Sequence, residues 1–198
     1  MGNSLPNLER TNQETTLRRW GMACLLTGVT IVGAHFAVPL PFTPVPITFQ
    51  VFAVLLSGLL LGSRWGALAQ VQYLMLGLLN APVFALGKFG LGVFLWPNVT
   101  GGYLLSYPIA AFVAGWIVER SQKSRGGEDV PLSAYCLAST VGLAVIYTLG
   151  CSWLALLSRP MLLPMTAVLA GAGWFLFWDA FKALAAIGIA RNLRSRNR

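Results

Sequence analysis

The sequence predicts an all-α integral membrane protein, a single bundle of six transmembrane helices. Of its 198 residues, 56% are hydrophobic and only 10% are charged, and the mean hydropathy is +0.68. A soluble domain carries roughly 25% charged residues. Apolar runs recur from Trp20 to Ala190, and several approach the roughly 20 residues that cross a bilayer. So many apolar residues exceed what one soluble core can bury.

Six apolar stretches are long enough to be helices. In chain order we expect them at Trp20–Val38, Thr48–Gly62, Trp65–Asn80, Gly102–Glu119, Leu132–Leu157 and Phe175–Ala190. The first interval, residues 39–46, reads Pro-Leu-Pro-Phe-Thr-Pro-Val-Pro. Its prolines remove backbone donors and exclude a helix, so we expect a stiff extended loop there. The second interval, near Ser63 and Arg64, is expected to be a tight turn.

The second predicted helix is short for a bilayer. Its roughly fifteen residues, Thr48–Gly62, cover about 22 Å of a hydrocarbon core that is roughly 30 Å thick. The proline-rich loop can make up the difference by dipping into the outer leaflet. Non-helical backbone is tolerated at that depth only when it is buried in protein or lines a cavity. We therefore expect this loop to cap a ligand pocket.

The positions of the basic residues predict the topology. With a cytoplasmic N-terminus, most of the 14 Lys and Arg fall on the cytoplasmic side: Arg10, Arg18, Arg19, Arg64, Arg120, Lys123, Arg125, Arg191, Arg194, Arg196 and Arg198. Lys88 and Arg159 fall on the other side. The positive-inside rule then places both termini in the cytoplasm. We expect a loose cytoplasmic tail at residues 1–19, a membrane domain at 20–191 and a basic cytoplasmic tail at 192–198.

Several function classes lack their motifs. The chain has no GxxxxGK[ST] sequence, so we expect it not to hydrolyse ATP. Cys24, Cys136 and Cys151 lie inside apolar runs, where cysteine usually acts as a small hydrophobe. His35 has no second ligand at metal spacing. We therefore expect no metal, no cofactor and no nucleic-acid partner.

Asp179 and Lys182 are the charged residues of the last predicted helix. Three positions apart, they lie on one helical face and should pair. Charges within a membrane usually mark a substrate or ion path, and a purely structural ion pair is the alternative. An Asp accepts and a Lys donates, so together they suit a neutral urea or amide. Asp179 is expected near the outer helix end, where the helix dipole favours an anion. Nearby aromatic residues can form walls or an interfacial belt: Trp174, Phe175, Phe177 and Trp178.

Other polar groups form a second set of candidates. The third loop runs through Asn98, Thr100, Gly101, Gly102 and Tyr103 into a helix, where backbone N–H groups can bind a ligand or simply make a turn and an N-cap. Side chains from the second and third helices can face a ligand or bond between helices; they are Gln50, Gln70, Gln72 and Tyr73. In the first helix, small residues at Ala23 and Thr27 permit either docking on a partner or internal packing.

Four stretches together resemble the BioY family, the biotin-specific substrate-binding components of energy-coupling-factor (ECF) transporters. They are Pro39-Leu-Pro-Phe-Thr-Pro-Val-Pro-Ile-Thr-Phe-Gln50, Leu59-Leu-Leu-Gly-Ser-Arg-Trp-Gly-Ala67, Thr100-Gly-Gly-Tyr-Leu104 and Asp179-Ala-Phe-Lys182. The resemblance covers about Leu25 to Arg191. It implies a six-helix S component that binds biotin from outside under a capping first loop and takes it up across the cytoplasmic membrane.

The resemblance also implies roles for individual residues. Asp179 would accept a ureido N–H of biotin, Lys182 would donate to a polar oxygen, and the loop from Asn98 to Tyr103 would line the site. Phe42 and Gln50 would contribute from the capping loop and the helix after it. The implied partners are a transmembrane coupling subunit (EcfT/BioN-like) and two ATPase subunits (EcfA/BioM-like).

Three other functions stay open at this point. One is binding of another vitamin, thiamine or riboflavin, on the same architecture. Another is an integral-membrane enzyme that uses Asp179 as an acid or base, although one carboxylate without a partner group is thin support. The third is an ion path, for which the sequence offers no chain of titratable groups.

Overall fold

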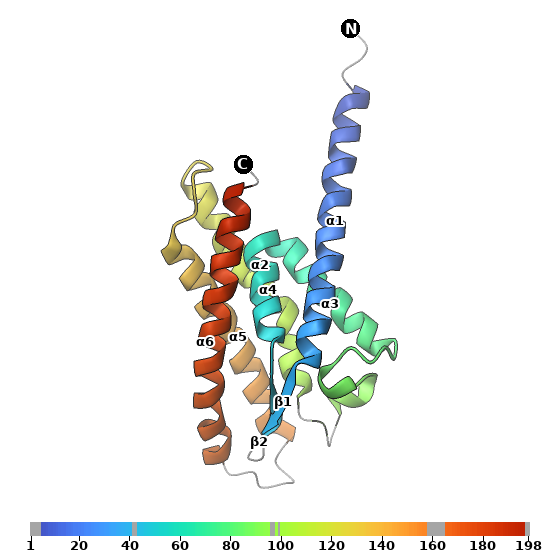
Figure 1. Cartoon of the computed structure of the whole chain (residues 1–198), viewed down its shortest axis with the longest axis vertical. Helices are drawn as coiled ribbons and strands as arrows, with labels where there is room; N and C mark the ends of the chain where they lie inside the picture. The colour runs from blue at the N-terminus through green and yellow to red at the C-terminus, as the bar shows by residue number, and fades with distance from the viewer. Residues whose placement is uncertain (1–4, 41–42, 96–97, 99, 158–164, 197–198) are drawn as a thin grey trace.

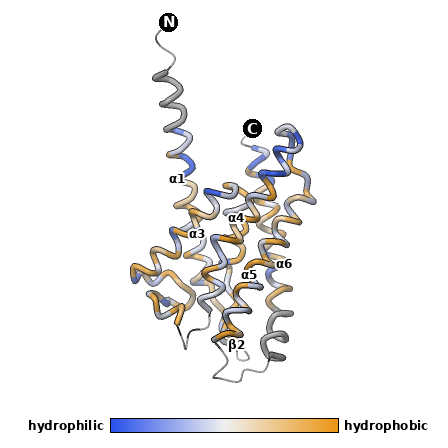
Figure 2. The backbone as a smooth tube through the Cα atoms, turned by 180° about the vertical axis from the view of Figure 1, so that it is seen from behind, coloured by the Kyte–Doolittle hydropathy of each residue, from blue (hydrophilic) through white to orange (hydrophobic). Residues whose placement is uncertain are grey.

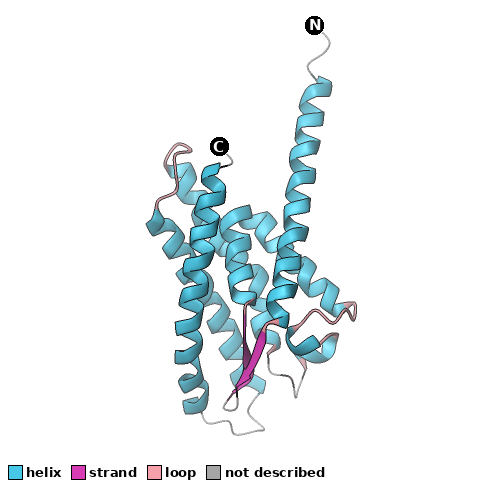
Figure 3. Cartoon of the chain, viewed as in Figure 1, coloured by secondary structure: helices cyan, strands magenta, loops and turns pink. Residues whose placement is uncertain are grey.

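Six α-helices make up most of the chain. The computed structural model describes residues 5–40, 43–95, 98, 100–157 and 165–196. The helices are α1 (Leu5–His35), α2 (Gln50–Leu61), α3 (Ser63–Leu78), α4 (Gly101–Ser124), α5 (Leu132–Leu157) and α6 (Met165–Arg196). A hairpin of β1 (Ala37–Leu40) and β2 (Thr43–Thr48) joins α1 to α2 (Figures 1 and 3). Two 3₁₀ turns, η1 (Ala85–Gly87) and η2 (Leu91–Phe94), lie between α3 and α4. The predicted number and order of helices are confirmed.

Helix α4 is at the centre of the bundle. It packs against α2, α3 and α5, while α6 packs on α2, and α1 packs on α2 and α3. The N-terminal end of α1 and the C-terminal end of α6 lie at the same end of the molecule, and the hairpin lies at the opposite end (Figure 1). The bundle therefore has two distinct ends, one with the chain termini and one with the hairpin.

Two helices begin earlier than the sequence predicts. Helix α1 begins at Leu5. The prediction of a loose tail up to residue 19 is therefore wrong for residues 5–19, which are helical. Its polar head consists largely of Glu, Arg, Gln and Leu, which are good helix formers, and Pro6 stands in the first turn, where a proline is tolerated. Helix α6 begins at Met165, ten residues before the expected Phe175, because the alanine-rich stretch ahead of it favours a helix despite its glycines.

The proline-rich segment is extended, as predicted, but its two halves pair as strands. β1 and β2 are antiparallel, with Ala37 opposite Thr48 and Leu40 opposite Thr43. The all-α prediction therefore lacked one hairpin. Prolines fit here because a two-stranded sheet leaves each strand a free edge, where a missing N–H removes no ladder bond. β2 leads into α2, which has only 12 residues, shorter still than expected.

The surface has the character of a membrane protein. Two helices of the described part are long and apolar enough to cross a bilayer, Gly101–Ser124 and Leu132–Leu156. Large apolar side chains stay exposed on the outer faces of several helices, among them Val32, Trp116 and Leu184. Hydrophilic segments gather at the end of the molecule where α1 begins and α6 ends (Figure 2). Six membrane crossings stay a prediction.

Buried amides join the first three helices. The Gln70 side-chain amide of α3 donates to Thr30 Oγ1 of α1 at 3.2 Å and to Ser57 Oγ of α2 at 3.1 Å. The Thr27 hydroxyl donates to the Ala69 carbonyl at 2.8 Å, and Ala23 is fully buried. Such bonds satisfy polar groups away from water. The small-residue face of α1 at Ala23 and Thr27 therefore packs internally, which decides between the two alternatives for this face.

Glycines bring α2, α3 and α4 into close contact. A Cβ at Gly58 of α2 would collide with the Ala111 carbonyl of α4, and one at Gly115 of α4 would collide with Gly62. Gly62 joins α2 to α3 with a φ of +85°, a conformation that other residues adopt only under strain. The Glu119 carboxylate accepts from the Ser63 backbone N–H at 2.9 Å and so satisfies a free donor at the start of α3. These contacts make the C-terminal halves of α2 and α4 dense.

We expect Gly58→Ala to destabilise the bundle by about 1–3 kcal/mol, because the added methyl group overpacks the α2 and α4 contact. Gly188→Ala in α6 is the matched control, since no atom lies within 4 Å of its added Cβ. Both variants gain the same intrinsic helix propensity. Thermal unfolding in detergent measures the difference, and equal melting temperatures for the two variants would contradict the close packing.

Candidate ligand-binding site

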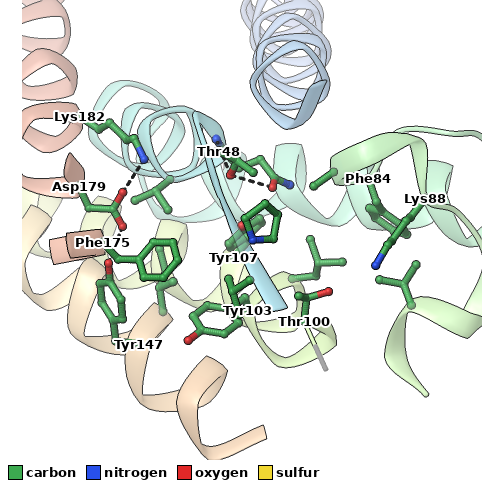
Figure 4. A pocket seen from close by; sticks show the side chains of 18 residues that line it. Thr48, Phe84, Lys88, Thr100, Tyr103, Tyr107, Tyr147, Phe175, Asp179 and Lys182 are labelled. Carbon is green, nitrogen blue, oxygen red and sulfur yellow. Dashed lines mark hydrogen bonds and ion pairs between the residues drawn. The ribbon is translucent and has the colours of Figure 1, made fainter. Parts of the chain in front are cut away.

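A cavity lies between the hairpin and the N-terminal halves of α2 and α4. It is partly open to solvent. The hairpin contributes Val45, Pro46 and Thr48, and the remaining walls come from α2, the segment between α3 and α4, and from α4, α5 and α6 (Figure 4). The described chain therefore brings six of its elements and segments to one space.

The charged pair of α6 stands at this cavity. Lys182 Nζ lies 2.7 Å from Asp179 Oδ1, and the two residues are only 7% and 4% exposed. Asp179 Oδ2 accepts a 2.7 Å hydrogen bond from the Tyr147 hydroxyl of α5. The predicted pairing of Asp179 with Lys182 is confirmed, and both residues line the cavity. Each carboxylate oxygen has one protein partner and can accept a second hydrogen bond.

The expected depth of this pair in the helix is wrong. Because α6 begins at Met165, Asp179 stands fourteen residues into the helix, about 21 Å from its first residue. The helix dipole acts mainly on the first turn, so it contributes little to the charge of Asp179. Lys182 and the Tyr147 hydroxyl stabilise the carboxylate instead.

A chain of hydrogen bonds runs away from the cavity wall through α2 and α3. Thr48 Oγ1 donates to Gln50 Oε1 at 3.0 Å, and Gln50 Nε2 donates to the Tyr73 hydroxyl at 2.6 Å. The Tyr73 hydroxyl donates onward to the Val83 carbonyl at 3.3 Å. Thr48 and Gln50 line the cavity, whereas Tyr73 is fully buried behind Gln50. Tyr73 therefore orients Gln50 and does not face the cavity.

The segment between α3 and α4 forms another wall. Lys88 lines the cavity, and its Nζ donates to Asn98 Oδ1 at 2.8 Å. Asn98 lies behind Lys88, outside the lining, whereas Thr100 is part of the lining. Phe84 anchors the segment, because its ring is 1% exposed and packs edge-on against Tyr73, with centroids 5.4 Å apart. The wall is therefore held by packing against α3.

The three remaining candidates of the third loop, Gly101, Gly102 and Tyr103, lie at the start of α4, and they do not all line the cavity. Tyr103 lines the cavity, and its hydroxyl lies 3.3 Å from Cys151 Sγ of α5. Gly101 and Gly102 are buried outside the lining. A Cβ at Gly101 would press on Phe94, and one at Gly102 would collide with Trp153 of α5. Close packing, and not approach to a ligand, is what these two glycines permit.

Sequence reasoning missed several lining residues. The sequence places Lys88 in a loop on the non-cytoplasmic side and gives no sign that it lines a cavity. The other missed residues lie inside apolar runs without a distinguishing motif: Phe84, Val93, Tyr107, Ile146 and Tyr147. A tyrosine within an apolar helix was the available signal for Tyr107 and Tyr147. Phe42 lies outside the described residues.

The aromatic residues at the start of the last predicted helix are expected either to form walls of the site or to lie in an interfacial belt, and the described ones differ in position. Phe175 lines the cavity. Phe177 and Trp178 are exposed on the outer face of α6, as a belt or a lipid contact requires. The side chain of Trp174 is outside the described part of the chain.

The lining suits a small, partly apolar molecule. Aromatic and aliphatic side chains form most of the wall, and the polar groups that converge on it include one carboxylate, two ammonium groups, the Gln50 amide and the Thr48 and Thr100 hydroxyls. Few convergent polar groups in an apolar concavity are typical of ligand sites. Among the described residues, no group of three His, Cys, Asp or Glu side chains is close enough to hold a metal ion.

The chain is similar to known proteins over nearly its whole length. Residues 9–198 match the BioY family. The chain is 34% identical over 178 residues to the biotin transporter BioY of Thermotoga maritima. The aligned region covers 90% of this chain and 96% of that protein. The chain is 38% identical over 173 residues to the probable biotin transporter BioY of Pyrococcus horikoshii, covering 87% and 94%. The resemblance inferred from four motifs is confirmed.

A solved structure shares the fold. It is the crystal structure at 2.1 Å of the S-component for biotin from an ECF-type ABC transporter. The TM-score is 0.79 over 92% of this chain and 93% of that one, with 24% sequence identity. This likeness shows that the six-helix arrangement described above is the S-component fold.

The ion pair predicts coupled effects on stability. Asp179→Ala and Lys182→Met should each destabilise the protein by about 3–5 kcal/mol, because each leaves one buried charge without its partner. The double variant removes both charges and should lose less than the sum, by about 1–3 kcal/mol. Thermal unfolding of the four proteins in detergent measures this coupling. Strictly additive losses would show that the two charges do not depend on each other.

Proposed function

This chain belongs to the BioY family, and we propose that it binds biotin and takes it up across the cytoplasmic membrane as the substrate-capture subunit of an ECF-type transporter. Its curated relatives are named as biotin transporters. The observation that carries the proposal is the buried Asp179 and Lys182 pair at the wall of an otherwise largely apolar cavity. The proposed role is that of a transporter subunit and not of an enzyme.

The chemistry of biotin matches the two sides of this pair. Its ureido ring presents N–H donors and a carbonyl acceptor, and its fused ring and aliphatic chain are apolar. Asp179 accepts from a ureido N–H and Lys182 donates to a polar oxygen. Gln50 and Thr100 also line the cavity and are further candidates for hydrogen bonds to the ligand. Phe175 and Tyr103 supply flat surfaces for the apolar part.

Binding of another vitamin is the runner-up function. Thiamine carries a permanent positive charge, whereas the lining has two ammonium groups and one carboxylate, so a cation is disfavoured. A membrane enzyme that uses Asp179 as an acid or base needs a second acid, a metal or an activated nucleophile beside it. The family relationship and this charge balance favour biotin.

The hairpin of β1 and β2 acts in this proposal as a cap on the site. Three of its residues line the cavity, and β2 leads directly into α2. The basic residues at the opposite end, including Arg120 and Arg194, lie in the cytoplasm in this proposal, together with the first turns of α1 and the last turn of α6. The cavity then opens toward the outside, where the ligand arrives.

Energy for uptake comes from partner proteins. We expect a transmembrane coupling subunit and two ATPase subunits, as in ECF-type transporters, because this chain carries no nucleotide-binding motif. The Ala23 and Thr27 face of α1 is excluded as the docking surface, since both residues are buried against other helices of this chain.

Biotin should produce a saturable change in the tryptophan fluorescence of the purified protein. The protein is prepared in detergent without added vitamin, and its seven tryptophans provide the signal. Thiamine and riboflavin at the same concentrations serve as controls and should give no saturable change after correction for their own absorbance. Saturation by either of these vitamins, without saturation by biotin, would overturn the proposed function.

Asp179→Asn should weaken biotin binding by roughly ten- to a hundred-fold, because an acceptor for the ureido N–H becomes partly a donor. Asp129→Asn in the exposed loop before α5 is the matched control and should bind normally. Tyr147→Phe keeps the ion pair and removes one hydrogen bond to Asp179, so it reports on the same carboxylate without leaving Lys182 unpaired. Unchanged biotin affinity in both site variants would remove Asp179 from the site.

A further inference from the structure

Lys88 places a second ammonium group on the cavity, away from the ion pair of α6. In the close-up of the cavity, Lys88 lies on one side and Asp179 and Lys182 lie on the opposite side (Figure 4). Apolar side chains such as Val93 and Ile146 belong to the lining as well. The cavity therefore has one end with a neutralised charge pair and another end with a single cation.

Within the described part of the chain, no carboxylate neutralises the charge of Lys88. Its Nζ donates to the carbonyl oxygen of the Asn98 side chain at 2.8 Å, a neutral acceptor. The Asn98 amide nitrogen donates to the Gly92 carbonyl at 3.0 Å, and this bond turns the Asn98 oxygen toward Lys88. Among the described residues that line the cavity, Asp179 forms an ion pair with Lys182. Lys88 therefore has a hydrogen-bond acceptor in Asn98 but no counter-charge.

The backbone around Lys88 is held in place. The Phe84 N–H donates to the Lys88 carbonyl at 3.0 Å, and the Lys88 N–H donates to the Ala85 carbonyl at 3.4 Å. Phe84 is buried between Tyr73 and Phe94, with ring centroids 5.4 and 6.1 Å away. The ammonium group is therefore presented from an anchored segment, and little conformational freedom is lost when it binds an anion.

From this arrangement we propose that Lys88 binds the carboxylate of the ligand, so that the cavity selects a monoanion and holds it in one orientation. The inference rests on the proposed biotin-binding function. Biotin carries a neutral ureido ring at one end and a carboxylate at the other end of an aliphatic chain. With the ureido ring at Asp179, the chain extends past the apolar lining toward Lys88. The two ammonium groups and two carboxylates of the complex then balance in charge.

Lys182 is the competing partner for the ligand carboxylate. Its Nζ already lies 2.7 Å from Asp179, and a second carboxylate at this position would stand beside that of Asp179. Two carboxylates in one buried place repel each other. Lys88 has no carboxylate neighbour among the described residues of the lining, so it takes an anion without this repulsion.

The methyl ester of biotin separates the two ends of the ligand, because it keeps the ureido ring and removes the negative charge. The wild-type protein should bind biotin more tightly than the ester. Lys88→Met should weaken biotin roughly ten- to a hundred-fold while the affinity for the ester stays the same. Lys88→Arg should keep the preference for the acid. Lys123→Met, at the opposite end of the bundle, is the control and should change neither affinity.

A second variant tests the charge without removing Lys88. Asn98→Asp places a carboxylate 2.8 Å from its Nζ, and this internal anion should compete with that of biotin and leave binding of the ester intact. Equal losses for acid and ester in both variants would show that Lys88 only supports the loop, and this result would overturn the inference. The wild type is expected to prefer biotin to its methyl ester. If this preference disappears in Lys182→Gln but persists in Lys88→Met, the carboxylate of biotin binds Lys182 instead. Failure of the wild type to bind either compound would refute the proposed function itself.

Discussion

The buried ion pair of Asp179 and Lys182 is the constraint on which the rest of the site depends. Isolated charges at such a depth are costly, so each must keep a partner and the carboxylate must keep its hydrogen bonds. Lys182 and the Tyr147 hydroxyl meet this demand at 2.7 Å each. As a result α5 and α6 are joined at the cavity wall, and the carboxylate keeps part of its accepting capacity at the cavity.

Helices α2 and α4 each have one half that packs closely and one half that lines the cavity. Their later residues, Gly58 and Gly115, remove side chains and bring the backbones together. Their first residues behave differently, because Gln50 and Tyr103 carry large polar side chains that line the cavity. The same two helices thus pack densely toward the end with the chain termini and line the cavity toward the hairpin (Figure 1). Dense packing allows the lining to keep its geometry when no ligand is bound.

The sequence predicts the framework of this protein better than the details of its site. Apolar run length gives six helices in the right order, and the spacing of Asp179 and Lys182 gives their contact. Helix starts are less predictable, because Met165 and Leu5 begin helices in segments that polarity or glycine content made look irregular. Strand pairing in the hairpin and the approach of Lys88 to the cavity depend on tertiary contacts. The roles of Gly101 and Gly102 likewise follow from neighbours that only folding supplies.

The two charges of the ion pair belong to a single helical turn, and this has a consequence for biogenesis. Groups three residues apart on one helix meet as soon as that helix forms, before any other segment arrives. If α6 crosses the membrane as proposed, its part before Arg191 can therefore leave the translocation machinery as an electrically neutral segment. Its entry into lipid does not have to wait for a counter-charge from another segment, and Tyr147 completes the arrangement when α5 docks alongside.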